Sequence, residues 1–302
     1  MTLMSIFLPI NWLKFFKRLN EYAILFFSIL IPTCNRNDFL KGCLDSLLVS
    51  INQLDSVSCE VIVSDDGTAN ESRRLIQDNY ALVKWIEGPQ KGPAANRNNA
   101  AKLAKGDWLI FLDDDCIPDK NLILAYYNHI KSNPSIKIFE GAIQPEGPSK
   151  TPLDYAPINI TGGHLWSCNF CIQKQLYVQI GGFDQLFIYP HMDDIDFKTR
   201  LLAEEKSILF VPKATVVHPW RKITSGIKLG KYQEMYVLYH EKHNKPYNIL
   251  KLLKEIILFH FSMLRKSSLI SDITIIFKST LEHLIIVVFS WRKWIKKYSH
   301  ER

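Results

Sequence analysis

The sequence lacks the motifs that identify the commonest phosphate-binding proteins. Neither the phosphate-loop pattern GxxxxGK[ST] nor the dinucleotide pattern GxGxxG occurs in its 302 residues. The sequence therefore gives no sign of a P-loop nucleotidase or of an enzyme with a Rossmann dinucleotide fingerprint. It also has no internal repeat and no low-complexity tract, which argues against a repeat array or a disordered chain.

Cysteine is scarce and scattered. The six cysteines lie at positions 34, 43, 59, 116, 168 and 171, mostly in apolar segments. This distribution excludes a small disulfide framework, so we expect reduced thiols in the cytosol. Cys168 and Cys171 form a single CxxC without a second pair or a histidine at zinc spacing, so a structural role is favoured over metal or redox chemistry.

Long apolar runs are missing too. The most apolar run, Leu284–Phe289, is far shorter than the roughly 20 residues that span a bilayer. The first 13 residues are apolar, but the basic residues come after this apolar stretch, whereas a signal peptide has them before it. No small-residue cleavage site is present either. We therefore expect neither a transmembrane helix nor a signal peptide. Residues 1–22 are expected to form an amphipathic segment that either lies at a membrane interface or packs on the protein.

The formal net charge of +7 is unevenly distributed. Residues 222–302 hold 15 Lys/Arg against 6 Asp/Glu, whereas residues 22–221 hold 19 basic and 23 acidic residues. A basic, aromatic-rich end such as Trp291–Lys297 favours an anionic membrane surface, and a solvated helical cap is the alternative. No nucleic-acid partner is expected, because the basic residues lie outside the predicted ligand edge of the sheet.

The order of the predicted elements indicates an α/β protein. Strands are predicted over 28–33, 59–64, 83–87 and 108–112, with helical patterns between them, and this alternation requires a parallel sheet. Further strands are predicted over 136–143, 166–172, 207–212 and 215–218, and a helix over 191–205. From residue 223 onward the pattern is helical and basic.

Three adjacent carboxylates follow the most apolar of these strands. Asp113, Asp114 and Asp115 come directly after Trp108–Leu112, where a buried strand reaches the ligand edge of the sheet. Such a cluster is costly unless a cation sits beside it, and a divalent metal takes oxygen ligands. A solvated acidic turn is the alternative for this cluster.

Six motifs in order resemble the inverting family 2 glycosyltransferases of the GT-A fold. The motifs are Ile31-Pro-Thr-Cys-Asn-Arg36, Val63-Ser-Asp-Asp-Gly-Thr68, Arg97-Asn98 before Gly106-Asp107, Leu112-Asp-Asp-Asp115, Gly181-Gly-Phe-Asp184 and Met192-Asp-Asp-Ile-Asp-Phe197. The resemblance implies a Rossmann-like, predominantly parallel twisted sheet flanked by helices over residues 23–222. The basic helical C-terminal extension would then be 223–302. It also implies a nucleotide-sugar donor, usually a UDP-sugar, and Mn²⁺ or Mg²⁺.

The resemblance assigns four residues to the donor. Asp66 would accept the N3–H of uracil, with Thr33 beside the nucleoside, because the ring nitrogen needs an acceptor. Arg97 would contact the donor nucleotide, and Asp113 the ribose or the metal. An ordinary β-turn at Asp66 and a surface arginine at 97 are the alternatives.

The metal would be held by Asp115 and Asp113, with His218 as a further ligand. The leaving UDP develops negative charge, and a divalent cation stabilises that charge without proton transfer. Histidine after a strand is also common as a purely structural residue, so that alternative stays open for His218.

On the acceptor side the resemblance makes Asp194 the general base. Asp193 stands where the family usually has Glu and would contact the acceptor, and Trp166 could stack on a sugar ring. Helix capping by the two aspartates and core packing of the tryptophan are the alternatives.

Together these residues predict an inverting, metal-dependent hexosyltransferase of polysaccharide biosynthesis, peripheral to the cytosolic membrane face. It would transfer sugar from a UDP-sugar to a hydroxyl of a glycan, in particular a lipid-linked one. A sugar nucleotidyltransferase is the second enzyme class, and the missing Gly-rich loop counts against it. A non-catalytic membrane-associated scaffold is the third alternative, and the complete set of aspartates counts against it.

Overall fold

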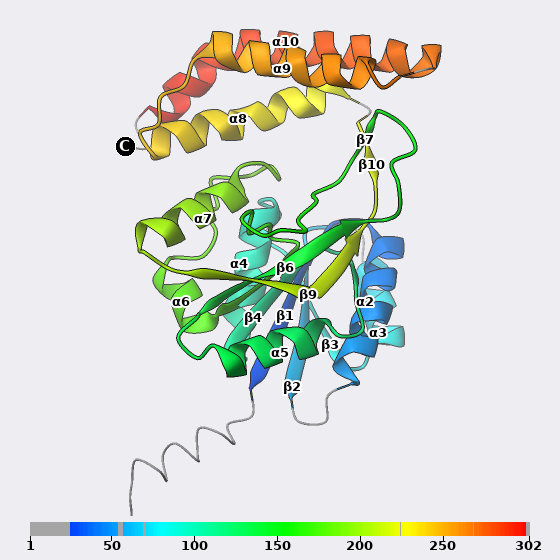
Figure 1. Ribbon diagram of the computed structural model, residues 1–302, viewed down its shortest axis with the longest axis vertical. Coiled ribbons are helices and arrows are strands. Elements are labelled where there is room, and N and C mark those ends of the chain that lie inside the picture. The colour runs from blue at the N-terminus through cyan, green and yellow to red at the C-terminus, as the bar shows by residue number, and fades with distance from the viewer. Residues whose placement is uncertain (1–24, 54–56, 69–70, 224, 268, 300–302) are drawn as a thin grey trace, which may run out of the picture.

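The computed structural model describes residues 25–299, apart from 54–56, 69–70, 224 and 268. The predicted amphipathic segment 1–22 therefore lies outside the described residues. From residue 25 to 222 the chain forms a layered α/β unit, and from 226 it forms three long helices (Figure 1).

The first part alternates strands and helices as the apolar pattern predicts. Each strand is a short, β-branched or aromatic run, and each helix carries apolar residues at helical spacing. The elements are β1 (Phe26–Thr33), α2 (Asn37–Ile51), β2 (Ser58–Asp65), α3 (Glu71–Asn79), β3 (Val83–Glu87), α4 (Pro93–Leu103) and β4 (Trp108–Leu112).

The second part is less regular, because short strands and turns interrupt the alternation. Its elements are β5 (Ile117–Pro118), α5 (Leu122–Ser132), β6 (Ile138–Pro145), β7 (Asp154–Tyr155), β8 (Asn169–Gln173), α6 (Lys174–Gln179), α7 (Asp193–Ala203), β9 (Ile208–His218) and β10 (Arg221–Lys222).

The main sheet has eight strands in the order β3-β2-β1-β4-β8-β6-β9-β5. Strand β1 lies between β2 and β4 and is parallel to both, and β2 is parallel to β3. Strand β8 runs antiparallel to β4 and β6, while β6 and β9 are parallel. From β1 the chain adds β2 and β3 on one side and β4 on the other. Open α/β sheets bind ligands at the point where the strand order reverses in this way.

Two of the expected strands differ from the observed ones. The strand predicted over 166–172 begins at Asn169, because Trp166 starts a turn in which the Asn169 N–H donates to the Trp166 carbonyl at 3.1 Å. The two strands predicted over 207–212 and 215–218 are one strand, β9. Its register shifts where Gly141 pairs with Val211 but Ala142 pairs with Thr215, and a bulge there accommodates Pro212, which has no N–H to donate.

The sheet has an apolar core on each face. On one face the buried side chains of α2, α3 and α5 pack on Ile29 and Ile110. On the other face α4, α6 and α7 pack on Leu30 and Phe111. Because side chains alternate along a strand, β1 and β4 bury apolar residues on both faces, as a central parallel strand does.

Three helices, α8 (Gly226–Lys242), α9 (Ile249–Leu264) and α10 (Ile270–Tyr298), confirm the predicted helical C-terminal region. Figure 1 shows them as a layer across one end of the molecule, with α8 nearer the sheet and α9 and α10 outermost. Buried residues of all three helices belong to the same apolar cluster as α4 and α7.

Helix α10 bears on two expectations. It has 29 residues and contains an 18-residue stretch with a mean hydropathy of 1.7, so it is long and apolar enough to cross a membrane. A count of uninterrupted apolar residues misses this, because Ser, Thr and His interrupt the run every few positions. By length and composition alone this is weak evidence for a span.

The second expectation places the tryptophans of 291–297 at a lipid surface, and the structure corrects it. Trp291 and Trp294 are only 9% and 5% exposed and pack with the α8 and α9 side chains. Helical spacing places both tryptophans, together with Tyr298, on the stripe of α10 that faces the protein.

Candidate functional site

A cavity of about 1140 Å³ lies where the carboxyl ends of β1 and β2 meet the C-terminal helices. All four residues predicted to bind the donor line it: Thr33, Asp66, Arg97 and Asp113. On the opposite side the lining comes from α8 and α9 and includes Lys228, Tyr232, Tyr236, Ile256 and Phe259. Its volume slightly exceeds that of an ordinary small-molecule site, so it has room for more than a donor.

Asp66 is fixed by backbone donors from the loop before α4. The Gln90 and Gly92 N–H groups donate to its two carboxylate oxygens at 2.9 and 3.2 Å. Burial nevertheless raises its pKa above the usual value. Gly88 makes this approach possible, because a Cβ there would lie 2.2 Å from Asp66 Oδ1.

The neighbouring Asp65 has a different task. Its carboxylate accepts from the Gly67 N–H at 2.7 Å and from the hydroxyl of Ser72, so it holds the turn after β2. Only Asp66 of the pair lines the cavity.

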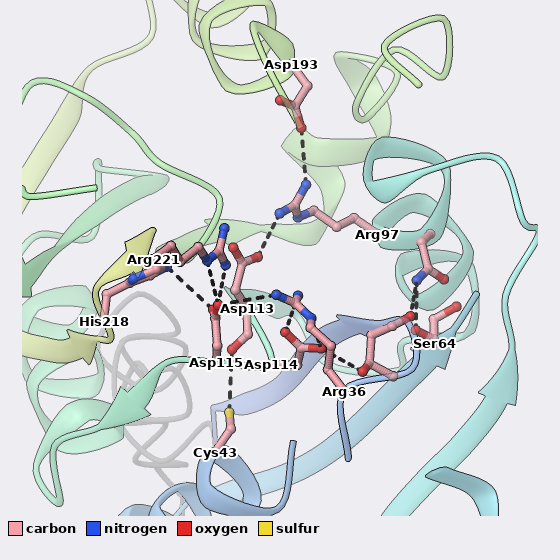
Figure 2. A network of polar contacts seen from close by, with 12 residues as sticks. Arg36, Cys43, Ser64, Arg97, Asp113, Asp114, Asp115, Asp193, His218 and Arg221 are labelled. Atoms are coloured by element: carbon pink, nitrogen blue, oxygen red, sulfur yellow. Dashed lines mark hydrogen bonds and ion pairs between the residues drawn. The ribbon is translucent and has the colours of Figure 1, made fainter. Parts of the chain in front are cut away.

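Arg97 joins the donor side to the acceptor side. Its guanidinium donates to Asp113 Oδ1 at 2.7 Å and to Asp193 Oδ2 at 3.2 Å (Figure 2). The arginine side chain is 5% exposed, so these contacts replace its hydration. Burial opposes ionisation of Asp113, but Arg97 and Arg221 together outweigh burial and hold the pKa of Asp113 below its usual value.

Asp114 is the most enclosed of the three adjacent carboxylates. It accepts from Thr33 Oγ1 at 2.7 Å and from Arg36 Nε at 3.1 Å. Burial raises its pKa to about 7. Thr33 therefore meets the acidic run directly as well as lining the cavity.

Asp115 contacts two arginines and a histidine. Arg221 Nε donates to Asp115 Oδ2 at 2.9 Å, and Arg36 reaches the same oxygen at 3.3 Å (Figure 2). The other oxygen, Oδ1, faces His218 Nε2 at 3.5 Å.

The structure brings two of the predicted metal ligands together. Asp115 Oδ1 and His218 Nε2 are both buried and have no hydrogen-bond partner among the residues that the structure describes. Together with the Cys116 thiol their ligand atoms lie within 4.8 Å of one another. His218 Nδ1 is held by the Pro219 carbonyl at 2.8 Å, which leaves Nε2 as the free nitrogen, and burial lowers the pKa of this imidazole.

A carboxylate and a neutral imidazole are ligands that Mn²⁺ accepts, so these residues fit the expected ion. The thiol is a softer ligand than Mg²⁺ prefers. Asp113 is held by Arg97 instead and does not belong to this cluster.

Asp193 and Asp194 begin α7 next to a strained residue, Met192, whose φ is +67°. Asp193 is buried against Arg97, whereas Asp194 is half-buried beside Ser167. Burial raises the pKa of both carboxyl groups. Within the described part of the chain the Asp194 Oδ1 atom has no hydrogen-bond partner, so it is able to accept a hydrogen bond.

The predicted acceptor residue Trp166 does not line the large cavity. Its ring stacks on His164 with centroids 5.3 Å apart and packs against the core under β6 and β8.

Sequence reasoning gave no role to two arginines that the structure places in the site. Arg36 and Arg221 line the cavity and bind the acidic run. Each lies three residues after a strand that ends at the ligand edge, β1 for Arg36 and β9 for Arg221, and that position is the signal that could have identified them.

The comparison with protein families agrees with this geometry. A family model described as "Glycosyl transferase family 2" matches residues 28–164, which contain β1, β2, β4 and all three adjacent aspartates. The chain contains a family 2 glycosyl transferase domain. The predicted family is thereby confirmed.

Relatives of this glycosyl transferase domain are bacterial. The chain is 31% identical over 193 residues to an uncharacterized glycosyltransferase of Haemophilus influenzae, covering 59% of this chain and 62% of the relative. It is 31% identical over 93 residues to the GalNAc(5)-diNAcBac-PP-undecaprenol beta-1,3-glucosyltransferase of Campylobacter jejuni, covering 29% of each. The alignments thus span less than two thirds of either relative.

Solved structures show the same fold. S. aureus TarS 1–349 in complex with UDP superposes with a TM-score of 0.52 at 14% identity, covering 88% of this chain and 91% of that one. The likeness confirms the predicted GT-A architecture of the glycosyl transferase domain. At this identity it supports the fold alone.

Proposed function

We propose that this protein transfers a sugar from a UDP-sugar to a hydroxyl of a bacterial glycan, with inversion. The observation that carries the proposal is that Thr33, Asp66, Arg97 and Asp113 line one cavity at the ligand edge of a family 2 domain. The structural neighbour TarS was solved in complex with UDP, and the same nucleotide is proposed here.

Each end of the donor meets suitable chemistry in this cavity. The half-buried Asp66 carboxylate offers an acceptor to the N3–H of uracil. Arg36, Arg97, Arg221 and Lys228 supply positive charge for the diphosphate.

Asp194 is proposed as the general base. It takes the proton of the acceptor hydroxyl while that oxygen attacks the anomeric carbon from the face opposite UDP. The bond between the anomeric carbon and the phosphate oxygen breaks in the same displacement, and UDP leaves with the electron pair. A raised pKa suits this role, because a base should titrate near the working pH.

Asp115 and His218 are proposed to hold Mn²⁺ or Mg²⁺, Mn²⁺ being the better match to the imidazole. Bound there, the cation would supply positive charge to the leaving diphosphate. Mn²⁺ affinity can be measured directly by the paramagnetic signal of the free ion. His218→Ala should weaken it about tenfold or more, and unchanged affinity would remove His218 from the site.

The acceptor is proposed to be a lipid-linked glycan at the cytosolic face of the membrane. The Campylobacter jejuni relative is named for an undecaprenol-linked glycan, which supports this class of acceptor. The basic C-terminal helices supply a surface that attracts anionic lipid.

The donor proposal is tested by thermal shift and by product analysis. UDP-sugars with Mn²⁺ should stabilise the protein more than GDP-sugars, since bound ligand stabilises the folded state. Turnover should release UDP and no pyrophosphate, which separates a transferase from a nucleotidyltransferase.

Asp66→Asn should weaken UDP binding roughly tenfold, because the charged acceptor is lost. Asp78→Asn, on the exposed face of α3, is the matched control and should bind UDP normally. Stabilisation by GDP-sugars alone would make the UDP proposal wrong.

A further inference from the structure

The outer surface of the C-terminal helical layer is apolar. Large apolar side chains of α9 and α10 stand exposed there, including Phe277 and Leu281, each 61% exposed, and Phe289 at 82%. On α9 they are joined by Ile257, Leu258 and Phe261. Exposed apolar side chains gathered on two adjacent helices mark an interaction surface, whereas scattered ones do not.

This apolar surface is distinct from the protein core, because the opposite stripe of α10 is the one that packs against the other helices. Ser279, His283 and Val287 are buried against the other helices. A Cβ at Gly226 of α8 would lie 1.8 Å from the Ser279 carbonyl oxygen, so the two helices touch closely. At the other end Tyr298 donates to Glu234 of α8 at 2.9 Å. Helix α10 thus has one face for the protein and one for a partner.

Charge identifies the partner. Beyond Phe289 the exposed stripe of α10 turns basic, with Arg292, Lys293 and Lys296 exposed. Residues 249–298 hold nine Lys/Arg and three Asp/Glu. A second copy of the chain would bring like charges together, whereas an apolar face bordered by basic residues matches an anionic bilayer surface.

The membrane-facing helices also line the cavity. Phe259 of α9 lies in the cavity wall and is 43% exposed, and Leu252 and Ile256 of the same helix continue the wall inward. The cavity therefore borders the layer that carries the apolar surface, on the side away from β1 and β2.

We propose that the exposed face of α9 and α10 lies in the plane of an anionic bilayer, with the cavity bordering that face at Phe259. A lipid-linked acceptor then keeps its lipid in the bilayer while its glycan enters along α9. This second part rests on the proposed acceptor class, whereas the membrane contact does not. The buried stripe of α10 includes Asp272 and His283, which pack on protein, so the helix lies along the bilayer and does not cross it.

The test is flotation of the full-length protein with vesicles, without donor or acceptor. Binding should be strong to vesicles that contain phosphatidylglycerol and weak to pure phosphatidylcholine. The double variant Phe277→Glu with Leu281→Glu should lose about tenfold or more of its partition, because charge replaces apolar contact with lipid. Val178→Glu, at an equally exposed apolar position on α6, is the control and should bind like the parent protein.

The basic end is tested separately. Lys293→Glu with Lys296→Glu should lower binding to the anionic vesicles about tenfold and leave the weak binding to neutral vesicles unchanged. High salt should likewise weaken the binding of the parent protein to the anionic vesicles, because salt screens exposed charges.

Three outcomes would overturn the proposal. The first is equal vesicle binding by the parent protein and by the double variant Phe277→Glu with Leu281→Glu. The second is undiminished binding of the parent protein to anionic vesicles at high salt. The third is a parent dimer that the double variant converts to monomers, without any vesicle binding. Failure of the transferase proposal is recognised independently, by the absence of UDP release in solution while vesicle binding persists.

Discussion

At the scale of single residues, Arg97 sets the arrangement of the site. It contacts Asp113 on the donor side and Asp193 at the start of α7, residues that are 80 positions apart in the chain. A buried arginine between two carboxylates fixes both, because leaving any of the three unpaired is costly. The first turn of α7, and with it Asp194, is thereby held at a defined position relative to the donor.

The pH dependence of turnover should report Asp194. Burial raises the pKa of this carboxyl, so the fraction of ionised base falls as pH drops through a value above the usual aspartate range. We expect kcat to rise with pH along an acidic limb displaced upward from about 4. Steady-state rates between pH 4 and about 9 give the profile.

Asp194→Asn should lower kcat by about two to four orders of magnitude and remove that limb, with UDP affinity unchanged. Glu204→Gln, on the exposed end of the same helix, is the control and should leave both rate and profile intact. A variant at 194 that keeps full activity would show that another group acts as base.

At the scale of elements, the contact between α8 and α10 depends on two glycines. A Cβ at Gly226 would lie 1.8 Å from the Ser279 carbonyl oxygen, and one at Gly230 would lie 2.7 Å from Ile286 Cβ. Helix α8 also lines the cavity through Lys228, Leu229 and Tyr232, so its position affects the site.

Gly226→Ala should therefore destabilise the helical layer, because the added methyl overpacks the helix contact by about 1–3 kcal/mol. Urea unfolding monitors the loss, and limited proteolysis should show faster cleavage within 226–299. Lys231→Ala, at an exposed position of α8, serves as the control. If Gly226→Ala unfolds at the same urea concentration as that control, the close packing is not what holds α8 in place.

At the scale of the whole molecule, Asp196 joins the sheet unit to the C-terminal helices. It is fully buried in α7 and is contacted by Arg200 of the same helix, by Lys242 of α8 at 2.8 Å, and by His243 at 2.8 Å. Burial opposes its ionisation, but Arg200 and Lys242 outweigh burial and hold the pKa below its usual value.

Because this pKa is lowered on folding, the stabilisation is fully present above the unfolded-state pKa of about 3.9. It is lost as pH falls through the lower folded-state pKa. Asp196→Asn should cost about 3 kcal/mol near neutral pH, and its unfolding temperature should approach that of the parent protein below about pH 4. A difference that persists undiminished into strong acid would mean that the charge of Asp196 is not its source.

Much of the fold could be predicted from the sequence, because apolar periodicity and strand-end chemistry are local properties. Strands β3 and β4 have their predicted bounds, and the donor residues Asp66 and Asp113 follow strands whose carboxyl ends share one edge. The short strands β5, β7 and β10 could not be predicted, because two residues are too few to form a pattern. The antiparallel insertion of β8 between β4 and β6 is a long-range pairing that leaves no local mark.

The sequence by itself determined the chemistry of the acidic run and the family to which it points, since the types and order of residues carry both. Only the tertiary structure divided the run: Asp113 faces Arg97, Asp114 faces Thr33 and Arg36, and Asp115 faces His218 and Arg221. Tertiary packing also turned Trp291 inward and Phe277 outward on the same helix. These outcomes depend on which elements pack against one another in space. The local sequence around a residue does not specify that packing.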